Sequence, residues 1–208
     1  MSAIKRKIIV LITMIALLIF PTWSYAALMG VMGWDSSHSG TAYGTFGYNY
    51  VMAAPNVDSM HVSSIYVRSG NTHMCEAGWF AFSDDIPKFF NAWMINGIYS
   101  ERIWENAPKD SNHRYQVENA IGTNWWKIYI DGVNKFTVNM NGWTHGDSVG
   151  TSERNLTTDT NYSHFWSMKY KNSSGTFNSW QTGSQYYDND PGYKYSKTSN
   201  TEFYVVQG

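Results

Sequence analysis

Short runs of alternating apolar and polar residues make up most of the chain after residue 40, and Gly, Asn, Ser and Thr separate them. A period of two is typical of half-buried strands, and no segment beyond the N-terminus shows the period of a long amphipathic helix. The pattern therefore predicts an all-β fold, a sandwich of two antiparallel sheets. The expected strands are 42–50, 61–67, 74–82, 89–95, 99–104, 113–119, 125–130, 133–140, 148–154, 163–170 and 201–206.

The clearest local element is a β-hairpin over residues 125–136, where two alternating segments flank Asp131-Gly132. Glycine supplies the positive φ that such a tight turn requires. Two segments, 33–47 and 172–195, are rich in Gly, Ser, Asn and Tyr. We expect these two segments to be the most flexible parts of the chain.

The N-terminus has the three parts of a secretory signal peptide. Lys5, Arg6 and Lys7 precede an apolar run over residues 8–20, and Ser24-Tyr25-Ala26 offers small residues for cleavage. The run is shorter than the ~20 residues that a membrane span needs. We expect residues 1–26 to be removed and residues 27–208 to form one secreted β-sandwich domain from a bacterial source, with no membrane attachment.

Charge and composition exclude several classes of function. Without the three signal-peptide cations, the chain has 12 Lys and Arg and 16 Asp and Glu. The resulting net charge of about −4 provides no positive field to attract nucleic acid. Cys75 is the single cysteine, so no intramolecular disulfide is expected, and strand alternation with Glu76 turns it into the core. The six histidines lack the paired spacings of zinc sites, and no glycine-rich phosphate cradle precedes a helix. We expect no metal and no cofactor.

Two glutamates are the strongest candidates for catalysis. Glu76 interrupts the apolar run 74–80, where a bare carboxylate is costly to bury, and Glu153 is an isolated acid on another predicted strand. If both project from one face of one sheet, their repulsion would keep one protonated, which suits an acid and a base. Glu76 could instead form a structural pair with Arg68 or Arg102.

The choice of these two glutamates is not forced by the periodicity. Glu153 could form a surface ion pair with its neighbour Arg154. Glu101, Glu105 and Glu118 also lie on predicted strands. Other acids, such as those at positions 84, 85, 110, 188 and 190, lie in segments typical of turns, where a solvated or capping carboxylate is expected.

Tryptophans are the candidates for the walls of a substrate groove. Most of the 10 Trp must fill the core, but alternation sends neighbours such as Trp125 and Trp126 to opposite faces. We expect Trp79, Trp125, Trp126 and Trp143 to line a groove. An aromatic groove suits either a sugar chain or a peptide.

The order Glu76-Ala77-Gly78-Trp79, then Asn124-Trp125-Trp126, then Glu153 resembles the glutamic peptidases, the fungal eqolisins and the plant neprosins. Eqolisins carry glutamine where Glu76 stands and a catalytic glutamate where Glu153 stands, whereas neprosin-like proteins use two glutamates. The resemblance covers residues 62–170 and implies a concanavalin-like jelly roll. We expect neither the long propeptide nor the intramolecular disulfides that eukaryotic members carry.

Three hypotheses follow from these residues. The first is an acid-active endopeptidase in which Glu153 activates water and protonated Glu76 stabilises the oxyanion. The second is a non-catalytic carbohydrate-binding sandwich, and the third is a glycoside hydrolase with the same two glutamates. We expect a monomer that acts on a polypeptide or a polysaccharide.

Overall fold

The computed structural model describes residues 29–52, 59–82, 86–155 and 162–208. The predicted signal peptide lies outside these residues. Within them the chain is all-β apart from one 3₁₀ turn, Ser36–His38. None of the described residues forms a helix with the length and hydropathy needed to cross a bilayer.

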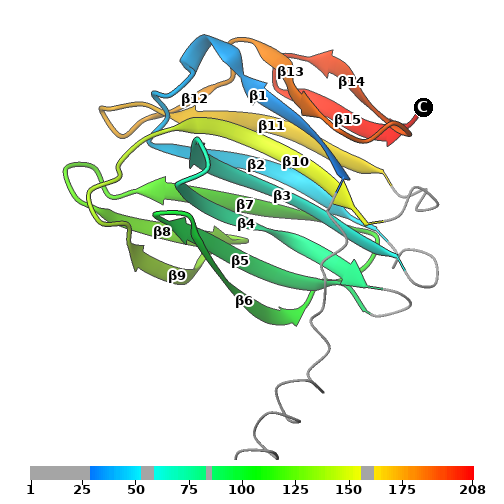
Figure 1. Ribbon diagram of the computed structural model, residues 1–208, viewed down its shortest axis with the longest axis horizontal. Coiled ribbons are helices and arrows are strands. Elements are labelled where there is room, and N and C mark those ends of the chain that lie inside the picture. The colour runs from blue at the N-terminus through cyan, green and yellow to red at the C-terminus, as the bar shows by residue number, and fades with distance from the viewer. Residues whose placement is uncertain (1–28, 53–58, 83–85, 156–161) are drawn as a thin grey trace, which may run out of the picture.

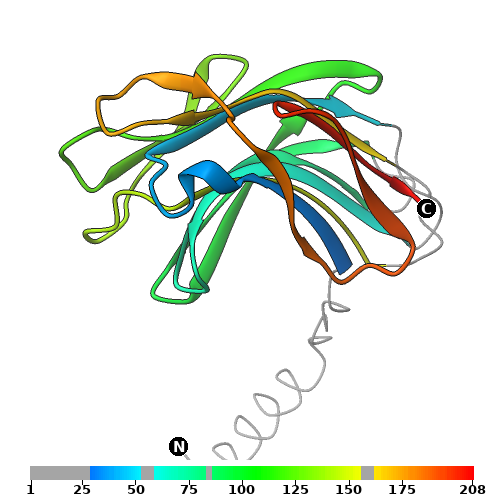
Figure 2. The same ribbon diagram turned by 90° about the horizontal axis from the view of Figure 1, so that it is seen from above.

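Two antiparallel sheets form the molecule (Figure 1, Figure 2). The seven-stranded sheet contains, in spatial order, β13 (Gly183–Asp188), β1 (Met29–Asp35), β10 (Asp147–Arg154), β3 (Met60–Ser69), β4 (His73–Phe82), β5 (Lys88–Ile95) and β6 (Ile98–Asn106). The eight-stranded sheet contains β14 (Tyr193–Ser199), β15 (Glu202–Gln207), β11 (Ser163–Lys171), β2 (Gly44–Val51), β7 (Ser111–Asn119), β8 (Trp125–Ile130) and β9 (Val133–Asn139), with β12 (Phe177–Ser179) paired to β11. The predicted jelly-roll sandwich is confirmed.

Each of the eleven predicted strands overlaps an observed strand, from β2 to β11 and at β15. The hairpin is β8–β9, and Asp131 and Gly132 at its turn have φ of 51° and 81°. The two segments that we expected to be flexible instead contain the end of β1, part of β2, β12, β13 and the start of β14. The prediction interpreted glycine as a loop signal, but at Gly33 it allows a close contact. A Cβ there would lie 2.7 Å from Cε2 of Tyr195. Gly33 therefore serves close packing inside a strand.

Large aromatic side chains fill the space between the sheets. Trp79 on β4 and Trp126 on β8 are fully buried there, and the Trp126 ring stacks on Trp143 at 4.3 Å between centroids. Cys75 is also fully buried and reduced, as strand alternation predicted. Burial of this apolar surface is the main source of stability in a fold without disulfides.

A buried ion pair ties the β13–β14 connection to β10. Nε of Arg154 donates to Oδ2 of Asp190 at 2.5 Å, and its Nη2 donates to Oδ1 at 2.6 Å. Neither side chain is exposed, and the guanidinium lies 3.7 Å from the ring centroid of Tyr193. Arg154 therefore points to the opposite face from Glu153, and the alternative of a surface ion pair between these neighbours does not match the structure.

We expect Asp190→Ala to lower the free energy of unfolding by about 3–5 kcal/mol, because it leaves the Arg154 charge buried without its carboxylate. The double variant Arg154→Met with Asp190→Leu removes both charges and should cost less than the single change. Urea denaturation of the three proteins measures the difference. A single variant as stable as the wild type would contradict this account of the pair.

Candidate active site

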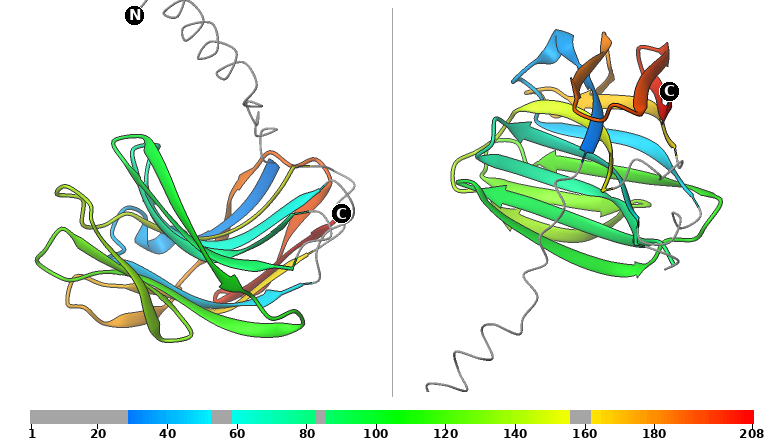
Figure 3. Two further views of the ribbon diagram at one scale, coloured as in Figure 1. Left: turned by 90° about the horizontal axis from the view of Figure 1, so that it is seen from below. Right: turned by 45° about the vertical axis from the view of Figure 1, so that its right-hand side comes forward.

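Strand register places Glu76 and Glu153 on the same face of the seven-stranded sheet. On β3, Tyr66 lies opposite Glu76 of β4, and Val62 lies opposite Glu153 of β10. Positions 62 and 66 differ by four, so both project from one side of β3. This side faces away from the eight-stranded sheet, and Figure 3 (left) shows how the sheet curves along it.

A groove of 1030 Å³ runs along this curved face, and both glutamates line it. Most of its other side chains are methionines, phenylalanines and aliphatic residues. The lining residues are Met32, Met60, Val62, Tyr66, Arg68, Met74, Glu76, Phe80, Phe82, Phe90, Met94, Tyr99, Ser100, Glu101, Ile103, Glu153 and Asn155. The groove is therefore a long apolar surface with carboxylates at a few places.

Glu76 is held so that it stays protonated at neutral pH. It is 6 % exposed, and burial and then the charge of Glu153 raise the pKa of its carboxyl from 4.5 to about 8. The hydroxyl of Ser64 donates to its Oε1 at 2.5 Å. Because Oε1 accepts this bond, Oε2 is the oxygen left to carry the proton.

Glu153 has a more polar environment. Burial raises the pKa of its carboxyl, but a hydrogen bond from Oγ1 of Thr151 at 3.4 Å and the charge of Arg68 both oppose that rise. The carboxyls thus differ in environment: Glu76 keeps its proton to higher pH, and Glu153 is the first to ionise. Such a split is what one general acid and one general base require.

Gly30 on β1 makes room for the Glu153 side chain. A Cβ at Gly30 would lie 2.8 Å from Cγ of Glu153. Asn189 fixes this part of β1 with two hydrogen bonds. Its side-chain Oδ1 accepts from the backbone amide of Gly30 at 2.6 Å, and its backbone amide donates to the Gly30 carbonyl at 3.2 Å. Glu153 is therefore positioned by the backbone of its neighbour as well as by its own strand.

The competing structural roles for these acids do not match the observed contacts. Arg68 donates to the hydroxyl of Tyr186 at 3.1 Å, and Arg102 lies over the ring of Phe136. Glu76 instead accepts from Ser64. Of the other strand glutamates, Glu105 pairs with Lys135 and Glu118 with Lys171, at the surface and on the other sheet respectively.

Glu101 is the third carboxylate of the groove. Its Oε2 accepts a hydrogen bond from the Tyr99 hydroxyl at 3.1 Å, and its charge adds a small upward shift to the Glu76 pKa. Both residues belong to β6, which is the edge strand of the sheet. Within the described ranges no group of three or more His, Cys, Asp or Glu side chains is arranged to hold a metal ion.

The prediction that four tryptophans line the groove is wrong. Trp79 is three residues from Glu76, so it faces the core, where Trp126 and Trp143 also pack. Trp125 is 48 % exposed on β8, in the other sheet. No tryptophan in the described part of the chain lines the groove.

Sequence reasoning missed the residues that do line the groove. Met74, Phe80 and Phe82 share the parity of Glu76 along β4, so alternation alone could have identified them. Ser64 and Tyr66 on β3 could not be found this way, because their place beside Glu76 depends on which strands pair.

The raised pKa of Glu76 predicts a cost to stability at high pH. The unfolded chain loses this proton near pH 4.5, whereas the folded protein keeps it up to about pH 8, so this group makes the folded state less stable as pH rises between those values. Glu76→Gln removes the titration and should stabilise the protein at pH 8 by up to about 4 kcal/mol, with little effect at pH 4.

Urea denaturation at several pH values measures this difference. Glu105→Gln is the matched control, because a hydrogen bond from Lys135 lowers the pKa of this exposed glutamate, and it should give no gain at pH 8. If both variants followed the wild-type pH dependence, Glu76 would be an ordinary ionised carboxylate.

Solved structures with a similar fold include glutamic peptidases. Scytalido-glutamic peptidase with a transition-state-analogue inhibitor matches with a TM-score of 0.61 at 9 % identity, over 87 % of this chain and 98 % of that one. SCP-B, of the eqolisin family, in complex with the tripeptide Ala-Ile-His, matches with a TM-score of 0.56 at 11 % identity and the same coverage. No family model and no curated protein matches the sequence. The chain has the fold of the glutamic peptidases, as the sequence resemblance implied.

Proposed function

We propose that this chain is a secreted endopeptidase that hydrolyses peptide bonds with Glu76 and Glu153. The observation that carries the proposal is the pair of carboxyls with unlike environments on one face of a long apolar groove. The likeness in fold to peptidases solved with transition-state analogues supports the same choice. Secretion rests on the signal peptide predicted for residues 1–26.

In this mechanism, ionised Glu153 takes a proton from water as the oxygen attacks the peptide carbonyl carbon. Protonated Glu76 donates a hydrogen bond from Oε2 to the oxyanion that forms. Glu153 then delivers its proton to the leaving nitrogen, the C–N bond breaks, and both carboxyls return to their starting states. Ser64 keeps Glu76 oriented throughout by its bond to Oε1.

The groove lining favours a polypeptide over a glycan. Methionine side chains are unbranched and polarisable, and they suit surfaces that accept varied apolar groups. Met32, Met60, Met74 and Met94 all line this groove together with three phenylalanines. Sugar rings offer many hydroxyls, which such a surface would leave without partners. An extended, unfolded chain with large apolar side chains is the substrate that fits.

We expect a bell-shaped pH dependence of kcat/KM on a denatured protein substrate between about pH 3 and pH 9. The acid limb follows the raised pKa of Glu153, and the alkaline limb lies near pH 8, where Glu76 loses its proton. Activity should therefore be highest at mildly acidic pH and extend towards neutrality.

Variants separate the two roles. Glu153→Gln removes the base and should lower kcat about 10²- to 10⁴-fold. Glu76→Gln keeps a hydrogen-bond donor that does not titrate, so it should retain part of the activity and lose the alkaline limb. Full activity of Glu153→Gln, or a wild-type enzyme that cleaves no polypeptide across this pH range, would refute the proposal.

Gly30→Ala tests the positioning of the base. The added methyl group occupies the space of Cγ of Glu153, and a displacement on the order of 1 Å can cost up to about 10²-fold in kcat. Gly33→Ala, on the same strand, is the control: it crowds Tyr195 and Phe203 in the core, so it should lower stability and leave kcat unchanged. Equal kcat for both variants and the wild type would contradict a positioning role for Gly30.

A further inference from the structure

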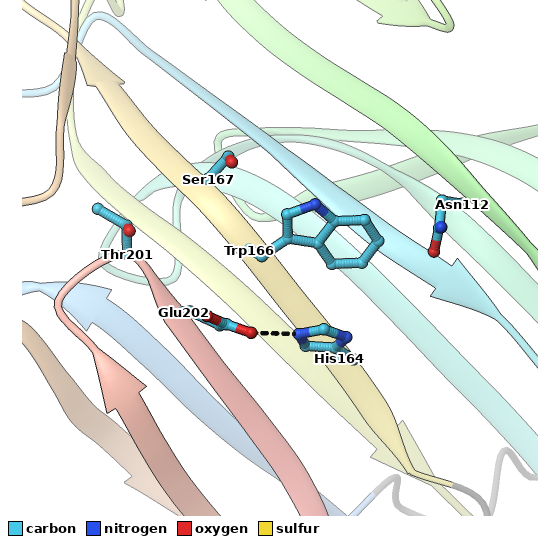
Figure 4. Close-up of a pocket in the computed structure, with 6 residues that line it drawn as sticks. All are labelled: Asn112, His164, Trp166, Ser167, Thr201 and Glu202. Atoms are coloured by element: carbon cyan, nitrogen blue, oxygen red, sulfur yellow. Dashed lines mark hydrogen bonds and ion pairs between the residues drawn. The ribbon is translucent and has the colours of Figure 1, made fainter.

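The eight-stranded sheet carries a second cavity on its outer face. It has a volume of 450 Å³ and is lined by Asn112, His164, Trp166, Ser167, Thr201 and Glu202 (Figure 4). Trp166 pairs across β11 and β2 with Tyr48, whereas their neighbours Phe165 and Asn49 face the core. The cavity therefore opens away from the seven-stranded sheet that holds the glutamates.

Stacked aromatic rings fix Trp166 as one wall of this cavity. Its ring stacks on Tyr48 at 5.5 Å with 14° between the planes and packs against His164 at 4.6 Å. His164 in turn stacks on Tyr204 at 4.0 Å and 7°. Contacts on two sides hold the indole, so a ligand would meet a preformed flat surface.

Polar groups surround the indole. Nε2 of His164 and Oε1 of Glu202 form a hydrogen bond of 2.9 Å, and the Glu202 side chain stays 37 % exposed. Figure 4 shows this pair on one side of the Trp166 ring and Asn112 beyond the other. The rim thus offers an amide, hydroxyls and a carboxylate, a mixed set of donors and acceptors.

Ser167 reaches the cavity through an unusual backbone conformation. Its φ is 54°, in the left-handed region, and the β11–β2 register shifts between Trp166 and Lys169. This bulge turns Met168 into the core and leaves Ser167 exposed beside Trp166, while the Met168 amide donates to the Thr201 carbonyl at 3.1 Å. Bulges that re-aim a side chain in this way are frequent near binding sites.

We propose that this cavity binds a saccharide. A pyranose ring has an apolar C–H face that can lie on the indole, and a rim of hydroxyls that can exchange hydrogen bonds with the amide, hydroxyl and carboxylate groups around it. The cavity has no aliphatic wall, which separates it from the methionine-rich groove and disfavours an apolar peptide. The Glu202 carboxylate disfavours anions, so a neutral sugar fits best.

The position of this cavity suggests what the interaction does, and this role, unlike the binding itself, rests on the proposed function. It lies on the outer face of the other sheet, so a polysaccharide bound there leaves the groove open. The saccharide site would hold the secreted protein on a glycan surface while the groove acts on neighbouring polypeptide. Local concentration of enzyme would rise without any new contact in the groove.

The test is a titration of the mature chain with soluble hexamers of glucose, xylose and N-acetylglucosamine, followed by tryptophan fluorescence and calorimetry. We expect saturable binding of at least one hexamer, with a Kd between about 10 µM and 1 mM. Trp166→Ala should weaken it by roughly tenfold or more, Glu202→Gln should weaken it, and Trp166→Phe should retain part of it.

Trp125→Ala is the matched control, because Trp125 is an exposed tryptophan on the same face of the same sheet. It is the first residue of β8, which β2 and β7 separate from β11. This variant should bind as the wild type does. Peptidase activity should be equal in Trp166→Ala and the wild type, so a failure here is distinct from a failure of the proposed catalysis. Absence of binding to every hexamer, equal affinity in Trp166→Ala, or binding lost in Glu76→Gln instead would overturn the proposal.

Discussion

The register between β10, β3 and β4 is the constraint on which the candidate site depends. Side chains alternate along each strand, so a slip by one residue would turn both glutamates into the core and Trp79 into solvent. The buried face makes that slip prohibitively costly, because it would expose the aromatic core and bury two carboxyls. The packing of the sandwich therefore also places both carboxyls on the groove face, so the geometry of the candidate site and the stability of the fold depend on the same hydrogen-bond ladder.

Within that strand register, the two carboxyls show how position alone can give two identical side chains different tendencies to ionise. Both lie on the same curved face, but Glu76 is almost fully buried beside one hydroxyl, whereas Glu153 has the Thr151 hydroxyl and the field of Arg68. Desolvation acts on both, and the compensating groups act mainly on one. The conflict between burying an acid and keeping the fold stable is the usual mark of a functional site.

Local alternation was enough to predict the sandwich and to single out Glu76 and Glu153 as candidates, whose catalytic role stays a prediction. The apolar surroundings of Glu76 identified its strand, and the hairpin at Asp131-Gly132 needed only turn chemistry. β1 and β13 escaped prediction because glycines that serve close packing look like loop residues until their neighbours across the sandwich are known, as at Gly33 against Tyr195. The prediction of the groove walls was wrong for a similar reason. The tryptophans were chosen by residue type, whereas strand parity and strand pairing decide which side chains share a face.

The edge position of β6 affects how related sequences can diverge. It is the edge strand beside the groove, and Tyr99, Glu101 and Ile103 project into the groove with β5 as their only neighbouring strand in the sheet. Substitutions at these exposed positions disturb little packing, whereas substitutions on β3 or β4 would disturb two neighbouring strands and the core. Related sequences can therefore vary the β6 wall of the groove while the strands that carry Glu76 and Glu153 stay fixed. The shape and polarity of the groove can thus diverge with little effect on the packing that holds the two carboxyls.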